Sequence, residues 1–287
     1  MGGVLTDERG GRRWWISVGL LGLLFVVLAL ILPLAIVVQR AFDAGFQNFA
    51  DALASAAFIR SIGNTAVLAL AVTISSAVIG YPYAYAMARS GKTLSRILLI
   101  ALMLSFWTSL LVRSYAWQVL LNDTGLVNTM LQAIGLIDEP LRLIRTPAAT
   151  LIGMTHILVP FAIFAIYSQL RGISPDLAIA AHGLGATRAR AFWSVTFPLS
   201  IPGLAAGSLL VFVLTLGFYI TPQLLGGAGN QVIGQSIVEQ TNTLLNTGVG
   251  SAMAVLLLAA VIVILAVTAR FLGLGKVLGI ALERNSA

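Results

Sequence analysis

Six long runs of apolar residues divide the chain, and they constrain its fold more than any other feature. Each run is close to the roughly 20 mostly apolar residues that a helix needs to cross a bilayer. Backbone polar groups find no water inside lipid, so segments of this length must be helical. Charged residues make up only 9% of the 287 residues, against roughly 25% in a soluble domain. The sequence predicts an all-α membrane protein with six transmembrane helices, at residues 16–39, 62–88, 97–121, 148–170, 203–225 and 250–272.

The basic residues predict how these helices are oriented, because Lys and Arg resist translocation across the membrane. If both termini are cytoplasmic, most of the 17 Lys and Arg residues lie inside, and the outer loops hold Arg40, Arg60, Arg142 and Arg145. We therefore expect a multi-pass protein of the bacterial inner (plasma) membrane. Its parts are an N-terminal tail (1–15), a transmembrane domain (16–272) and a C-terminal tail (273–287), with both tails cytoplasmic. The net charge of +7 fits this retention and contact with lipid headgroups, and we do not expect nucleic-acid binding.

Between the fourth and fifth runs lies a polar-tolerant segment, residues 171–202, which we call the knob. Its caps and breaks predict two short helices on the cytoplasmic side. A serine before a proline starts the first helix, glycines break it, a threonine caps the second, and prolines mark the entry to the fifth run. These residues are Ser174, Pro175, Gly183, Gly185, Thr187, Pro198 and Pro202. The knob is suited to docking on a cytoplasmic partner, and the alternative is a pair of interfacial helices lying on the membrane.

The knob resembles the EAA loop of the membrane subunits of binding-protein-dependent ABC importers. That pattern reads Glu-Ala-Ala, three residues, Gly, nine residues, Ile-x-Leu-Pro, and here Ala180-Ala181 and Gly185 are followed by residues 195–198 (VTFP) at the same spacing. One position departs, since Ile179 replaces the glutamate and Asp176 lies about one helical turn earlier. The resemblance implies that the knob docks on an ATPase subunit. The residues that would make this contact are Asp176, Ile179, Ala180, Ala181, His182, Gly185 and Pro198.

Further stretches are similar to the spermidine/putrescine importer permeases, although permeases for other small amines, opines or phosphonates can share them. They are residues 80–85 (GYPYAY), 106–109 (FWTS), 113–117 (RSYAW), 135–138 (GLID), 146–147 (TP) and 221–227 (TPQLLGG). The resemblance implies the type I ABC importer permease fold and a polyamine substrate. It also implies three kinds of partner. These are an ABC ATPase dimer, a second permease subunit that is a copy or a paralogue, and a periplasmic or extracellular substrate-binding protein.

A polyamine is a flexible cation, best held by carboxylates and by aromatic faces. The outer half of the chain offers candidates for a substrate path: Trp107, Tyr115, Trp117, Asp123, Phe218, Tyr219 and Glu239. Interface belt or packing roles are the alternative for the aromatic residues. Arg113 lies about 16 residues into the third predicted span, or ~24 Å along a continuous helix, near the outer interface. We expect Arg113 to be either a snorkelling anchor or a gate that pairs with Asp123.

The sequence offers no catalytic site. It has no cysteine, and it lacks the hydrolase motifs Gly-x-Ser-Gly and His-Glu-x-x-His. The segment Gly91-Lys92-Thr93 mimics the end of a phosphate-binding loop, but Ala86 occupies the place of its first glycine. We therefore expect no metal or cofactor on this chain, no enzymatic activity, and ATP with Mg²⁺ on a partner ATPase.

Two other functions are less consistent with the sequence. An ion-coupled secondary transporter needs titratable groups inside its spans, and His156 alone lies well inside one. We expect His156 to bond a nearby backbone carbonyl, such as one freed by Pro160. An intramembrane hydrolase fits only the number of spans.

Overall fold

The computed structural model describes residues 8–272, and its regular elements are all helical. The first helix begins at Glu8, so part of the segment predicted as a tail is helical. Residues 1–7 and the predicted tail 273–287 lie outside the described residues. The α-helices are α1 (Glu8–Ala41), α2 (Gln47–Ala54), α3 (Ala56–Arg89), α4 (Lys92–Trp107), α5 (Leu110–Leu120), α6 (Leu126–Ala133), α7 (Pro147–Gly172), α8 (Pro175–Gly183), α9 (Arg188–Ala191), α10 (Phe197–Leu216), α11 (Ile220–Leu225), α12 (Ile233–Val238) and α13 (Thr247–Leu272). Short turns of other type are the π-helices η1 (Phe192–Thr196) and η3 (Glu239–Thr243) and the 3₁₀-helix η2 (Ala228–Asn230).

Five of the described helices are long and apolar enough to cross a membrane, and a bent pair makes a sixth span. The prediction of a continuous helix over 97–121 is wrong in this respect, because α4 and α5 meet at an angle of 94°. Thr108 and Ser109 lie at the bend in extended backbone conformations. The Thr108 hydroxyl donates to the Leu104 carbonyl at 3.0 Å, and such side-chain bonds compete with the helical backbone pattern.

The fifth predicted span, 203–225, is also broken. Helix α10 ends at Leu216, three residues from Gly217 to Tyr219 follow, and α11 then begins at Ile220. Glycine is a poor helix former, and Pro222 has no N–H with which to continue the helical pattern back to Phe218. The single-helix prediction failed because these two local signals lie within an otherwise apolar run.

The prolines that mark the entry to the fifth run do not interrupt the helix. From Arg188 to Leu216 the chain is helical for 29 residues, with Pro198 in the first turn of α10 and Pro202 inside it. The π-helix η1 lies immediately before Pro198. A π-turn widens the helix and loosens its hydrogen-bond pattern, which accommodates a residue that cannot donate.

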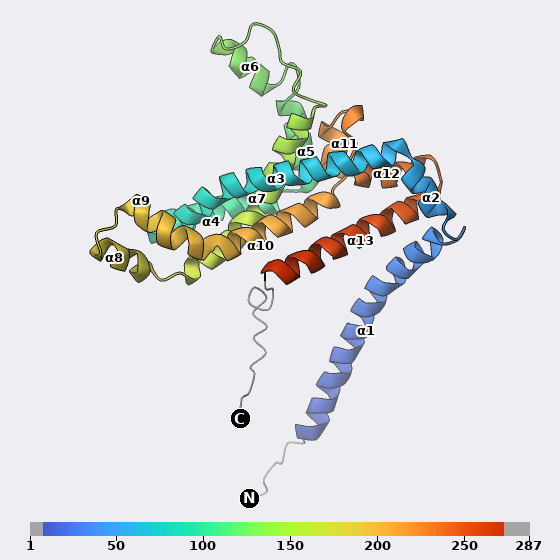
Figure 1. Cartoon of the computed structure of the whole chain (residues 1–287), viewed down its shortest axis with the longest axis horizontal. Coiled ribbons are helices and arrows are strands. Elements are labelled where there is room, and N and C mark those ends of the chain that lie inside the picture. The colour runs from blue at the N-terminus through green and yellow to red at the C-terminus, as the bar shows by residue number, and fades with distance from the viewer. Residues whose placement is uncertain (1–7, 273–287) are drawn as a thin grey trace, which may run out of the picture.

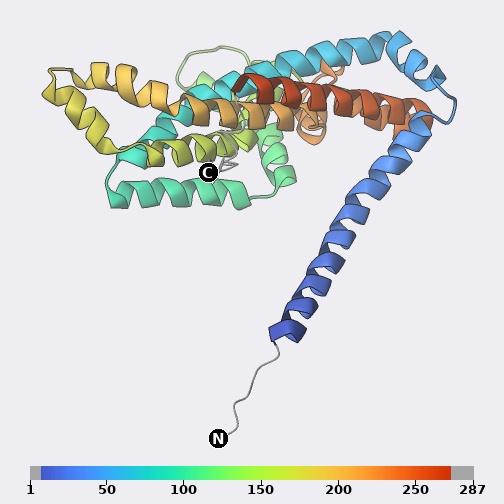
Figure 2. The same ribbon diagram turned by 60° about the horizontal axis from the view of Figure 1, so that its bottom comes forward.

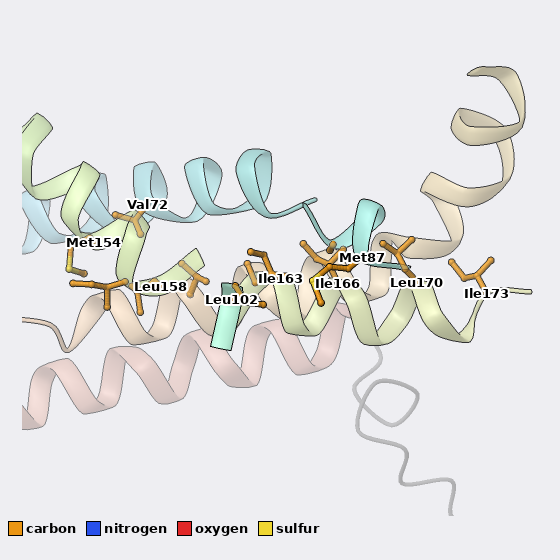
Figure 3. Close-up of a cluster of buried hydrophobic side chains, with 13 residues drawn as sticks. Val72, Met87, Leu102, Met154, Leu158, Ile163, Ile166, Leu170 and Ile173 are labelled. Atoms are coloured by element: carbon orange, nitrogen blue, oxygen red, sulfur yellow. The ribbon is translucent and has the colours of Figure 1, made fainter. Parts of the chain in front are cut away.

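Helices α3, α7 and α10 form the centre of the molecule and lie side by side (Figure 1). Their buried side chains make the main apolar cluster, which runs along α7 from Met154 to Leu170 (Figure 3). Small residues allow the helices to approach closely. A Cβ atom placed on Gly207 of α10 would lie 3.1 Å from the Ala162 carbonyl oxygen of α7. Close packing therefore fixes these three helices relative to one another.

Helix α1 diverges from this bundle (Figure 2) and meets α13 near its own C-terminal end. Nearly all residues of its apolar span, Gly22–Ala41, are exposed, and Ala41 at its end is buried. The Asn48 side chain in α2 donates to the Ala41 carbonyl at 3.1 Å and so closes the end of α1. The side chains described between Leu23 and Val38 of α1 are mostly exposed apolar groups.

Candidate functional site

The knob projects as α8 and α9 at one end of the bundle (Figure 1). Its helix starts are those that the sequence predicts. The Ser174 hydroxyl oxygen accepts a hydrogen bond from the Asp176 backbone N–H at 3.2 Å. The same hydroxyl group donates to the Asp176 carboxylate at 3.0 Å. Thr187 caps α9 by accepting the Arg190 N–H at 3.3 Å. Both helices are therefore capped by their own sequence, without support from the membrane spans.

The turn between α8 and α9 requires glycine at position 185. Gly185 has φ +86°, its N–H bonds the His182 carbonyl at 2.9 Å, and the Ala186 N–H bonds the Ala181 carbonyl at 3.0 Å. This pair of bonds is the Schellman motif that ends many helices. The exposed His182 imidazole donates through Nδ1 to the Ala186 carbonyl at 2.8 Å and ties the same turn. Gly183, which the sequence analysis treats as a break, is the last residue of α8 instead.

Several apolar side chains on the surface of the knob are exposed. Ile179 is 63% exposed, Leu184 91% and Trp193 63%. Of the residues expected to contact an ATPase, Ala181 is half-buried, and the others are exposed: Asp176, Ile179, Ala180, His182, Gly185 and Pro198. A preformed turn with an exposed apolar side is suited to docking in a groove of another protein.

A second cluster lies where α5 and α11 pack against α7. The buried hydroxyl groups of Ser114 and Thr221 are 3.0 Å apart and share a hydrogen bond, which joins the second segments of the two broken spans, α5 and α11. The sequence analysis missed this link. The hydroxyls are visible in the sequence, but nothing there places residues that are 107 positions apart in contact.

His156 contacts side chains from the neighbouring helices, not the backbone carbonyl expected from the sequence. The Trp117 indole N–H donates to His156 Nδ1 at 3.0 Å. Indole is only a donor, so Nδ1 must be the unprotonated nitrogen. The hydrogen then resides on Nε2, 3.5 Å from the Ser105 hydroxyl. This bond from Trp117, a candidate for the substrate path, ties α5 to α7.

Arg113 lies within this cluster. Its Nε and Nη1 atoms are enclosed and have no hydrogen-bond partner within residues 8–272. No ion pair between Arg113 and Asp123 forms within the described chain. The 94° bend also removes the continuous helix on which the ~24 Å estimate of its height rests. Arg113 is therefore a partly buried residue beside the α5–α7 contact, and its role as an anchor or a gate stays a prediction.

The other path candidates are dispersed over the surface. Trp107 is 84% exposed, Tyr115 54% and Tyr219 40%, and Phe218 is half-buried. Asp123 and Glu239 are exposed, and Glu239 accepts a long hydrogen bond of 3.5 Å from Gln231. The described residues form no cluster of three or more His, Asp or Glu side chains that could hold a metal ion.

Broken membrane spans around a three-helix centre, with a capped helical knob at one end, define a helical membrane protein. The sequence comparison specifies the class. Residues 80–274 match the family described as "Binding-protein-dependent transport system inner membrane component", and the chain belongs to this family. It is therefore a multi-pass protein of the inner membrane with the permease fold of ABC importers.

The curated relatives include spermidine/putrescine transport system permease proteins PotB from several bacteria. The one from Salmonella typhimurium is 38% identical over 173 residues, which cover 60% of this chain and 60% of the relative. The chain thus spans about 60% of the length of that relative. The Haemophilus influenzae protein is 33% identical over 215 residues, covering 75% of each chain.

A solved structure shows the same fold. It is a bacterial ABC transporter involved in the import of the acidic polysaccharide alginate, with a TM-score of 0.73 and 21% identity over 91% of this chain and 96% of the matched chain. At this identity the likeness concerns the fold alone.

Proposed function

We propose that this chain is the permease subunit of an ATP-driven, binding-protein-dependent importer for the polyamines spermidine or putrescine. The observation that carries the proposal is the knob, a rigid and self-capped turn whose exposed side coincides with the loop by which the family resemblance implies ATPase docking. The similarity to spermidine/putrescine permeases supports the choice of substrate. The chain itself is not an enzyme in this proposal, and ATP with Mg²⁺ binds to a dimer of separate ATPase subunits.

The knob, both termini and the ATPases then lie in the cytoplasm, as the distribution of basic residues predicts. Ile179 takes the position of the family glutamate and offers the ATPase an apolar contact. Asp176, one turn earlier, is exposed beside it and supplies the negative charge. Docking therefore combines an apolar centre with one carboxylate at its edge.

A second permease subunit, either a copy or a paralogue, completes the pathway. Helix α1 supports this part of the proposal, because most of the described side chains of its apolar span are exposed. Part of that apolar surface packs against the second subunit and the remainder faces lipid. A substrate-binding protein on the outer side delivers the polyamine, which explains why the described spans contain so few charged groups.

The transport cycle follows from these contacts. ATP closes the ATPase dimer and draws the two knobs together, the permeases open outward to receive substrate, and hydrolysis returns them to the inward-open state. Asp123 and Glu239 provide exposed carboxylates for brief contacts with the cation. Tyr115 and Tyr219 offer exposed aromatic faces.

Reconstitution of the complex into proteoliposomes tests the proposal. Uptake should require ATP, and binding protein loaded with spermidine or putrescine should stimulate ATP hydrolysis. Stimulation only by binding protein loaded with an anionic or uncharged solute would refute the polyamine assignment and leave the permease assignment intact. Uptake driven by an ion gradient without ATP would refute both.

A further inference from the structure

The inner end of α3 carries three side chains spaced four residues apart, Tyr81, Tyr85 and Arg89. Residues four apart lie on one face of a helix. This face is directed at the knob, and we call these three residues the α3 contact face. It includes two tyrosines of the GYPYAY segment, to which the proposed function assigns no role.

The two tyrosines hold the segment that leaves the knob. The Tyr85 ring packs edge-on against Phe192, with centroids 5.3 Å apart and an interplanar angle of 87°. The Tyr81 ring lies 5.5 Å from Phe197 at 60°. Edge-to-face pairs of this kind are favourable and directional. The tyrosines therefore grip the π-helix η1 and the start of α10 rather than the exposed turn.

A hydrogen bond reinforces this contact. The Tyr81 hydroxyl lies 2.8 Å from the Ser200 hydroxyl, and Ser200 is fully buried. Ser200 gives its one hydrogen to the Phe197 carbonyl at 2.7 Å. Tyr81 must therefore be the donor, and the direction of the bond is fixed.

Arg89 holds the segment that enters the knob. Its Nη2 atom donates to the Ile173 carbonyl at 3.2 Å, directly before α8 begins at Pro175. Ile173 is 7% exposed and belongs to the same buried cluster as Met87 of α3 and Leu170 of α7. One face of one helix thus contacts both chain segments that carry α8 and α9.

We infer that the α3 contact face transmits displacement of the knob into the transmembrane core, so that Tyr81, Tyr85 and Arg89 are positioning residues for the coupling of ATP hydrolysis to transport. The inference rests on the proposed function in one respect, namely that an ATPase moves the knob. Because both ends of the short-helix pair are attached to α3, the pair and the inner end of α3 move as one body. The exposed docking residues are untouched by this contact.

Spin labels test this directly, because the chain has no cysteine and labels can be placed at chosen sites. One label at Ala189→Cys reports on the knob, and one at Val78→Cys, 66% exposed, reports on α3. Distances are measured by pulsed electron paramagnetic resonance in the complex with its ATPase, without nucleotide and with ATP plus vanadate. We expect a narrow distance distribution that is the same in both states.

Variants of the contact face should break this rigidity. With Tyr85→Leu and Arg89→Gln combined, the distribution should broaden or shift when ATP is added, and uptake per ATP hydrolysed should fall roughly fivefold or more, within the usual range of coupling free energies. Tyr81→Phe keeps the ring, removes only the hydrogen bond to Ser200, and should give a smaller loss. Copurification with the ATPase should remain normal for all of these variants.

Tyr83→Phe is the matched control. The Tyr83 hydroxyl donates to the Leu98 carbonyl of α4 at 2.7 Å, away from the knob, so uptake per ATP should be unchanged. A knob-to-α3 distance that changes with ATP in the otherwise native chain would overturn the inference, as would normal coupling in the double variant. Failure of the native chain to assemble with any ATPase would instead refute the proposed function.

Discussion

Substitution of Gly185 should weaken docking of the ATPase without weakening the transmembrane core. Gly185 has φ +86°, and a Cβ atom there would meet no heavy atom within 4 Å. The cost of a side chain is therefore purely one of backbone conformation. For ordinary residues the left-handed region costs about 1–2 kcal/mol, so Gly185→Ala should populate the native turn roughly 5–30-fold less.

The same reasoning ranks the variants by their expected affinity for the ATPase. Asparagine tolerates this backbone region better than other residues, so Gly185→Asn should bind nearly as well as the native chain. Gly185→Val should be worse than Gly185→Ala, because a branched Cβ restricts the backbone further. Gly183→Ala is the control. It has no positive φ and no atom within 4 Å of its Cβ position, and alanine is the better helix former by about 1 kcal/mol.

The assay is titration of the purified permease in nanodiscs with its ATPase subunit, with the melting temperature of the permease measured in parallel. We expect the dissociation constant to rise from Gly185→Asn through Gly185→Ala to Gly185→Val, at constant melting temperature, because a side chain at position 185 would meet no atom of the transmembrane core. Equal affinity of Gly185→Val and Gly183→Ala would show that the turn is not needed for docking.

Three further predictions address other parts of the molecule. Asp176→Ala should uncouple ATP hydrolysis from uptake while Ile179→Glu is tolerated, and unchanged coupling in both would limit Asp176 to stabilising the start of α8. Gly207→Ala should lower the free energy of unfolding by about 1–3 kcal/mol, because its Cβ would lie 3.1 Å from a backbone oxygen of α7; chemical denaturation should show no such loss for Gly63→Ala, which has no close neighbour. Glu239→Gln should slow spermidine uptake at an unchanged basal ATPase rate, and equal uptake would remove Glu239 from the substrate path.

Local signals allowed the knob to be predicted almost completely. Ser174 and Thr187 cap helices through hydrogen bonds within three residues of chain, and Gly185 closes a turn whose bonds span five residues. Such structure depends on neighbouring residues, which a sequence displays directly. Gly183 was misassigned because only the backbone conformation separates a terminal helical glycine from one that breaks the helix.

The breaks in two of the predicted spans were not predicted, because contacts between residues distant in the sequence determine them. Hydropathy treats 97–121 and 203–225 as uniform apolar runs, yet both are broken, and their second segments are joined by the bond between Ser114 and Thr221. A bend of 94° exposes backbone groups that only packing against other helices can shelter. The contacts of His156 could not be predicted for the same reason, because its partners Trp117 and Ser105 lie on separate helices.

The long helix that follows the knob is held differently at its two ends. From the knob the chain continues as one helix of 29 residues to Leu216, which is roughly 44 Å long at 1.5 Å per residue. Its inner end is held by Tyr81, and its outer end meets the break at Gly217. No break interrupts the helix between the knob and Gly217. Because α11 follows this break and bonds to α5 through Thr221 and Ser114, the two segments are tied to each other at the place where the long helix ends.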